Sequence, residues 1–131
     1  MKYIAIRRIK IKSLLGYVNI PYGAVLSCES GVLTLDNVPI CGDHSQNAYR
    51  YFARNDDGNG LERGELTSLI VKTLANNDEN HQSRWDIIWE DAICQKYKRK
   101  DYDDYWLWSH DFYNADINDI RHIASILDIK Y

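Results

Sequence analysis

Cysteine is scarce in this 131-residue chain, and its arrangement argues against two common uses of it. The chain has three cysteines, Cys28, Cys41 and Cys94, and no CxxC pair. A disulfide framework or a zinc finger needs paired cysteines at regular spacing, so neither is expected. We therefore expect free thiols and a reducing, cytoplasmic environment.

Long apolar runs are also missing. The longest spans only a few residues, far below the roughly 20 that a membrane-crossing helix needs. The first 17 residues alternate charged with apolar side chains and lack the uninterrupted apolar core of a signal peptide. We expect neither membrane insertion nor secretion.

The chain lacks an excess of positive charge. Its net charge of −3 and pI near 5.7 give no general attraction to phosphate backbones, so nucleic-acid binding would need a local basic patch. The basic run Lys96, Lys98, Arg99 and Lys100 lies at an expected helix end, where the helix dipole favours cations, and aspartates follow at once. The sequence thus argues against direct nucleic-acid binding and slightly favours a basic partner.

Catalytic motifs are absent as well. The sequence contains no Walker loop, Rossmann fingerprint, nucleophile elbow or HExxH. His110 with Asp111, and Asp43 with His44, could be catalytic or metal-binding pairs, but neither has the spaced second ligand of a recognised motif. Cys94 has no histidine nearby in sequence and fits an inert, buried thiol. We expect no enzyme activity, no cofactor and no metal.

The residues that are present predict one α+β domain. Hydrophobic residues make up 45% and charged residues 27%, as in ordinary globular proteins. Residues 3–11 alternate with period two and predict a strand, although Arg7 and Arg8 disturb the pattern. Residues 24–28, 32–35 and 38–41 are short apolar runs between turn residues and predict a β-meander.

Pro39 cannot donate a ladder hydrogen bond, so the third run should lie at a sheet edge or be irregular. In such a meander Cys28 and Cys41 lie two strands apart, roughly 9 to 10 Å, and should stay free thiols. We therefore expect an N-terminal antiparallel β-meander over residues 1–43, packed against about four helices in residues 44–131.

Helical periodicity begins near His44. Ser45 is expected to cap a first helix that reaches Phe52 and ends at the polar loop, residues 55–60. Ser83 and Asp86 resemble the capping box of a third helix, and Asp116 should cap the last. The expected buried faces are Leu66, Leu69, Ile70, Thr73 and Leu74 in the second helix, Trp85, Ile88, Trp89 and Ala92 in the third, and Ile117, Ile120, Ile123, Ala124 and Leu127 in the last.

The polar loop, NDDGNG, invites comparison with a calcium-binding EF-hand. With Gly60 at the sixth loop position, however, Leu66 takes the place of the bidentate glutamate. A helix-joining turn is the favoured interpretation, with calcium binding as an alternative. Another alternative is a nucleotide or anion held at the helix N-terminus. The residues of that candidate site are Arg54, Asn55, Asp57, Asn59 and Arg63.

The acidic aromatic segment, residues 101–116, packs six aromatic residues and five aspartates into sixteen positions. Its aromatic side chains could simply anchor an irregular connection on the core. Alternatively, the segment forms a protein-binding surface with aromatic hot spots and carboxylates facing a basic partner. The candidate partner-binding residues are Asp101, Asp103, Asp104, Tyr105, Trp106, Trp108, His110, Asp111 and Tyr113.

Three passages, YFARNDDGNGLERGEL (residues 51–66), RWDIIWEDAICQKYKR (84–99) and WLWSHDFYNADINDIRHIA (106–124), resemble small, largely uncharacterised proteins of Gram-positive phages and prophages. The resemblance carries no catalytic residue. It implies a non-enzymatic protein-binding module whose partner is a host or phage protein. One candidate is an inhibitor of a basic, CRISPR-like nuclease complex of host defence. The sequence does not specify an oligomeric state.

Overall fold

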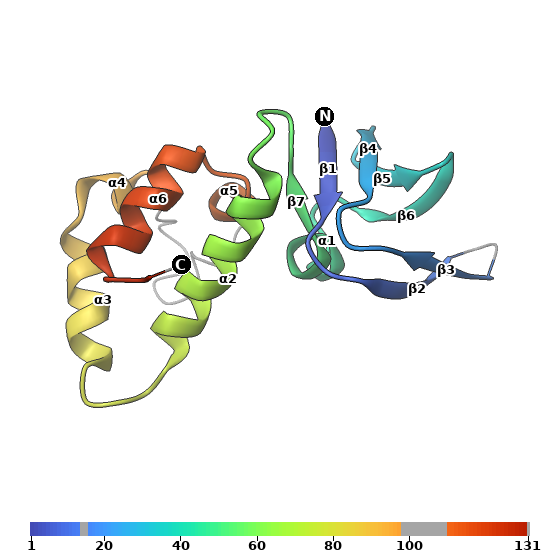
Figure 1. The fold of residues 1–131 in the computed structure, drawn as a ribbon. Helices are drawn as coiled ribbons and strands as arrows, with labels where there is room; N and C mark the ends of the chain where they lie inside the picture. The colour runs from blue at the N-terminus through green and yellow to red at the C-terminus, as the bar shows by residue number, and fades with distance from the viewer. Residues whose placement is uncertain (14–15, 98–109, 131) are drawn as a thin grey trace. The chain divides into compact units, whose positions relative to one another are not determined.

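The computed structural model describes residues 1–13, 16–97 and 110–130. The chain forms two compact units, an N-terminal unit, Met1–Gly64, and a C-terminal unit, Glu65–Tyr131, and each is described by itself. An N-terminal antiparallel β-meander is followed by helices, which confirms the predicted α+β class (Figure 1). That the chain folds as a single domain stays a prediction.

The N-terminal unit is mainly β-structure. Its largest sheet has five antiparallel strands in the order β6-β5-β4-β1-β7, and a separate two-stranded sheet pairs β2 with β3. The elements are β1 (Lys2–Ala5), β2 (Ile9–Ser13), β3 (Gly16–Ile20), β4 (Val25–Glu29), β5 (Val32–Leu35), β6 (Val38–Gly42), α1 (Gln46–Tyr51) and β7 (Phe52–Arg54).

Both turns of the meander use left-handed backbone conformations. Ser30 and Gly31 between β4 and β5 have φ values of 50° and 77°, and Asp36 and Asn37 between β5 and β6 have 51° and 67°. Two successive positive φ values suit the twist of a tight hairpin, and Gly, Asn and Asp tolerate them best. The predicted hairpin turns are therefore confirmed.

Strand β6 is the edge strand that Pro39 requires. It is the first strand in the sheet order, and its pairing with β5 shifts register between Leu33 and Thr34. Cys28 on β4 and Cys41 on β6 both pair with Leu33 of the intervening β5, and both are free thiols. The expected edge position and the unpaired cysteines are both confirmed.

Two predictions about this unit are wrong. Residues 3–11 do not form one strand, because the chain leaves the sheet at Ile6–Arg8 and β2 pairs with β3 instead. The helix capped by Ser45 ends at Tyr51, and Phe52, Ala53 and Arg54 return to the sheet as β7 beside β1. The polar loop therefore joins a strand to a helix, because pairing with β1 outweighs the local helical pattern.

The helix that follows the loop lies close to β1 and to Ile6, which follows β1, and two glycines permit this approach. Helix α2 (Gly60–Ala75) begins in the N-terminal unit. A Cβ atom on Gly60 would lie 2.5 Å from Ile4 Cγ2, and one on Gly64 would lie 2.4 Å from Ile6 Cγ2. Such separations are shorter than real contacts, so only glycine permits this approach. Ile4 is buried beside the helix, whereas Tyr3 and Ala5 are buried in the unit's core. Strand β1 is therefore covered on both faces.

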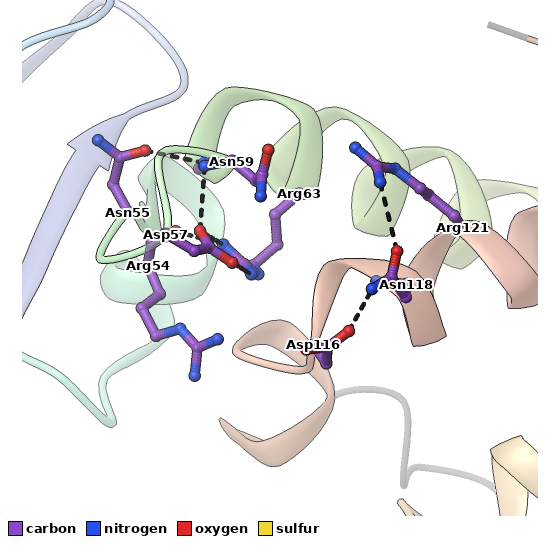
Figure 2. A network of polar contacts seen from close by, with 9 residues as sticks. Arg54, Asn55, Asp57, Asn59, Arg63, Asp116, Asn118 and Arg121 are labelled. Carbon is purple, nitrogen blue, oxygen red and sulfur yellow. Dashed lines mark hydrogen bonds and ion pairs between the residues drawn. The ribbon is translucent and has the colours of Figure 1, made fainter.

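The C-terminal unit is helical. After the rest of α2 it contains α3 (His81–Glu90), α4 (Ala92–Gln95), α5 (His110–Tyr113) and α6 (Ile117–Ile126). Asp116 caps α6 as predicted, since its Oδ1 accepts from the Asn118 backbone N–H at 2.8 Å (Figure 2). The core is built from Leu66, Ile70, Leu74, Ile88, Cys94, Phe112, Ala115, Ile120, Ile123 and Ala124.

The predicted third helix is divided into two. Helix α3 begins at His81 rather than after Ser83, and Asp91, in an extended conformation, ends it. The Asp91 carboxylate then caps α4 by accepting from the Cys94 backbone N–H at 3.0 Å. Aspartate favours such a cap over a helix interior, which explains the break. Ala92, expected on the buried face, is exposed as a result.

Across the part of the chain that the structure describes, no helix has the length and apolar character to cross a membrane.

Candidate functional site

The polar loop uses its own backbone donors internally. The Asn59 N–H donates to Asp57 Oδ1 at 3.0 Å, and the Gly60 N–H donates to Asn55 Oδ1 at 2.8 Å. Gly58, with φ of 78°, donates to the Asn55 carbonyl at 3.2 Å. Asx-type bonds of this kind hold a tight turn and satisfy the first N–H groups of the following helix.

The loop is also held to strand β1. The Asn55 N–H donates to the Lys2 carbonyl at 2.8 Å, and the Lys2 N–H donates to Asp56 Oδ1 at 2.6 Å. These two hydrogen bonds continue the pairing of β7 with β1, so the loop is held by the sheet as well as by the start of α2.

Arg63 and Asp57 form the strongest ionic contact near the loop. The Arg63 side chain is fully buried at 0% exposure, and both Asp57 carboxylate oxygens accept from it, Oδ1 at 3.2 Å and Oδ2 at 2.6 Å (Figure 2). Arg63 also donates to the Arg54 carbonyl at 2.6 Å. The hydrogen bonds from Arg63 hold the pKa of the Asp57 carboxyl well below its usual value, although partial burial works in the opposite direction.

The structure thus brings together all five candidate ligand residues, Arg54, Asn55, Asp57, Asn59 and Arg63, but mostly as partners of one another. Asp57 occupies the position that an external anion would take, and its two oxygens are directed at Arg63 rather than at a cation. The Asn55 side-chain oxygen accepts from Gly60. Binding of calcium or phosphate would have to break these contacts. The geometry favours the structural interpretation of the loop.

The acidic aromatic segment is described only at its C-terminal end. Six of its candidate residues lie outside the described residues: Asp101, Asp103, Asp104, Tyr105, Trp106 and Trp108. His110 opens α5, and only its backbone is described. Asp111 is exposed, whereas Tyr113 is half-buried against the core and its ring meets that of Phe112 edge to face, 5.5 Å between centroids.

Other carboxylates of the C-terminal unit lie in internal contacts. Asp91 Oδ1 lies 2.8 Å from His122 Nε2. Burial raises the pKa of Asp91, but hydrogen bonds from His122 and Cys94 outweigh it, and the net pKa is lowered. Asp119 accepts from the Tyr97 hydroxyl at 2.5 Å and lies 3.4 Å from Lys96 Nζ. Both carboxylates therefore help hold the helices together.

Of the two His–Asp pairs considered in the sequence, Asp43 with His44 lies within the described residues, whereas the side chain of His110 lies outside them. His44 Nε2 lies 3.6 Å from Asp43 Oδ1, and the Cys28 thiol donates to Asp43 Oδ2 at 3.9 Å. Burial and the Asp43 charge raise the pKa of Cys28, so its thiol is protonated at neutral pH. Burial, with the Asp91 charge, raises the pKa of Cys94 to about 12. Within the described ranges, no group of three or more His, Cys, Asp or Glu side chains is placed to hold a metal ion.

One surface was missed by sequence reasoning. Lys10, Lys12, Tyr17 and Asn19 are exposed on the same side of the β2–β3 hairpin, and we call them the basic face. The signal was present: no acidic residue precedes Glu29, and residues 9–12 read I-K-I-K. The low overall charge concealed it.

No protein-family model matches the sequence, and comparisons with curated proteins and with solved structures found no match either. The resemblance to phage proteins therefore stays a prediction.

Proposed function

We propose that the chain is a non-enzymatic, cytoplasmic protein-binding module whose acidic C-terminal unit contacts a basic protein surface. The observation that carries the proposal is the division of side chains at the described end of the acidic aromatic segment. Phe112 is completely buried in the core and Tyr113 packs against it, while Asp111 and Asp116 are exposed. The described end of the segment, residues 111–116, is thus anchored on a folded unit and carries two exposed aspartates.

The charge distribution supports the same proposal. The C-terminal unit has thirteen acidic and eight basic residues, whereas the N-terminal unit has six acidic and eight basic residues. An acidic surface attached to a folded unit accelerates encounter with a basic partner and disfavours acidic ones. Tryptophan and tyrosine in the same segment would provide the apolar contacts that dominate binding energy.

The identity of the partner rests on the phage-like resemblance alone, which points to a nuclease complex of host defence. Such complexes are basic because they hold nucleic acid, and this suits an acidic inhibitor.

Affinity capture from a Gram-positive bacterial lysate tests the proposal. The variant combines Asp111→Asn with Asp116→Asn, since asparagine keeps the α6 cap while removing the charge. Glu90→Gln and Asp86→Asn together remove the same charge from exposed positions on α3 and serve as the matched control. We expect a discrete basic protein to be retained at low salt, and retention to fall several-fold in the Asp111/Asp116 variant only. Equal retention by both variants would rule out this surface.

A further inference from the structure

The β2–β3 hairpin has one apolar and one polar face. Ile9 pairs with Ile20 and Ile11 with Val18, and all four side chains join the core of the N-terminal unit. Direct cross-strand partners lie on the same face of a sheet, and successive residues alternate. The intervening pairs, Lys10 with Asn19 and Lys12 with Tyr17, therefore form the basic face on the opposite side. Figure 1 shows β2 and β3 side by side as this hairpin.

The basic face combines cations with an accessible aromatic ring. Lys10 Nζ lies 4.8 Å from the centre of the Tyr17 ring, in a cation–π contact across the diagonal of the hairpin. Tyr17 nevertheless keeps 67% of its surface exposed. An aromatic ring left this open on a strand is uncommon, because burial of a tyrosine is normally favourable.

The sequence that contains the hairpin carries charge of one sign. Five of the eight basic residues of the N-terminal unit lie in residues 2–12, and no carboxylate occurs in the chain before Glu29. Arg7 and Arg8, both exposed, lie in the bend that leads from β1 into β2. Lysines two residues apart on a strand are separated by about 7 Å, close to the separation of successive phosphates along an extended nucleic-acid strand.

We propose that the basic face of the hairpin binds single-stranded nucleic acid. Lys10 and Lys12 contact the phosphates, Tyr17 stacks on a base, and the Asn19 amide offers hydrogen bonds. Proteins that bind single strands without sequence preference combine such a charged track with aromatic stacking platforms. An acidic peptide would pair with the lysines but would give the exposed ring of Tyr17 no base to stack on. The site is built only from residues of the N-terminal unit, and it would be the local basic patch that the net charge of the whole chain does not predict.

Fluorescence anisotropy with labelled mixed-sequence single-stranded DNA and RNA of about 20 nucleotides tests the proposal. We expect binding, and the logarithm of the observed association constant should fall linearly with the logarithm of the salt concentration. Removal of two phosphate contacts by Lys10→Ala with Lys12→Ala should reduce that slope by about 1.4. Lys72→Ala with Lys130→Ala removes equal charge from exposed positions outside the hairpin and should change neither slope nor affinity.

Tyr17 separates base stacking from simple charge attraction. Tyr17→Val, which suits a strand, should weaken binding roughly 5- to 150-fold without changing the salt slope, and Tyr17→Phe should bind like the unchanged protein. Circular dichroism verifies that each variant is folded. The proposal is overturned if no oligonucleotide binds at low salt, or if Tyr17→Val binds as tightly as the unchanged protein. It is also overturned if the Lys10/Lys12 and Lys72/Lys130 variants have the same affinity and salt slope. It is also overturned if polyglutamate displaces the oligonucleotide as well as unlabelled single-stranded DNA does, since an acidic protein would then be the ligand.

Discussion

Neutralising Asp57 should destabilise the N-terminal unit far more than its surface position indicates. The Asp57 side chain is 34% exposed, but its partner Arg63 is fully buried, so Asp57→Asn leaves a buried cation with a weaker acceptor. Breaking a fully buried ion pair costs about 3–5 kcal/mol. Because water can reach Asp57 and the asparagine oxygen still accepts one bond, we expect a loss of about 2 kcal/mol in the free energy of unfolding at neutral pH.

The effect should depend on pH in a defined direction. The folded-state pKa of Asp57 is depressed below its ordinary value of 3.8, so the unfolded chain takes up the proton first as the pH falls. The stabilisation is therefore fully present above pH 3.8 and is lost progressively below it. The difference between the unchanged protein and Asp57→Asn should be constant from pH 7 to about pH 5 and should shrink below about pH 4.

Urea unfolding followed by far-ultraviolet circular dichroism is the appropriate assay, because all four tryptophans lie in the C-terminal unit and their fluorescence would not report the N-terminal unit directly. Asp56→Asn is the matched control. It removes the same charge one residue earlier and still accepts from the Lys2 N–H, so it should cost less than about 0.5 kcal/mol. Equal losses in the two variants, or a difference for Asp57→Asn that grows as the pH falls, would refute the reasoning.

Three further predictions concern other parts of the chain. Gly64→Ala should lower the free energy of unfolding in urea by about 1–2 kcal/mol, because the steric overlap of the new Cβ with Ile6 costs more than alanine gains in helix propensity. Adding Ile6→Ala should remove most of that penalty in a double-mutant cycle. The Cys94 thiol, buried and with its pKa raised to about 12, should react with iodoacetamide at pH 8 only after unfolding, whereas half-buried Cys28 should react measurably in the native protein; mass spectrometry of digests would show the opposite order if the burial is wrong. Millimolar calcium or ATP should leave the thermal midpoint unchanged, since the 55–60 loop satisfies its own donors and acceptors, and a rise of several degrees with either would restore the corresponding ligand site.

Local chemistry was enough to predict the features that depend on neighbours in sequence. Ser45 and Asp116 cap helices because their side chains reach N–H groups two or three residues onward. The turn at Asp36 and Asn37 follows from residues that tolerate positive φ, and Pro39 marks an edge strand because it lacks an N–H.

The features that sequence reasoning missed depend on distant partners. Phe52 and Ala53 continue a helical pattern, yet they pair with β1, about fifty residues earlier in the chain. Arg63 was a candidate residue of the alternative anion site, because the sequence does not show that the loop folds Asp57 back onto it. The net charge of the whole chain did not indicate the basic face of the hairpin, because it sums an N-terminal unit of net positive charge and a C-terminal unit of net negative charge.

Photo-crosslinking from position 111 tests the central claim, that the acidic C-terminal unit binds a basic protein, most directly. A photoreactive phenylalanine analogue replaces exposed Asp111 in one protein and exposed Glu90 on α3 in another, so both lose one carboxylate. We predict that position 111 yields a discrete adduct with a basic protein from a Gram-positive bacterial lysate, that raised salt suppresses it, and that position 90 yields none. No adduct at position 111, or the same adducts from both positions, would contradict the proposed binding surface.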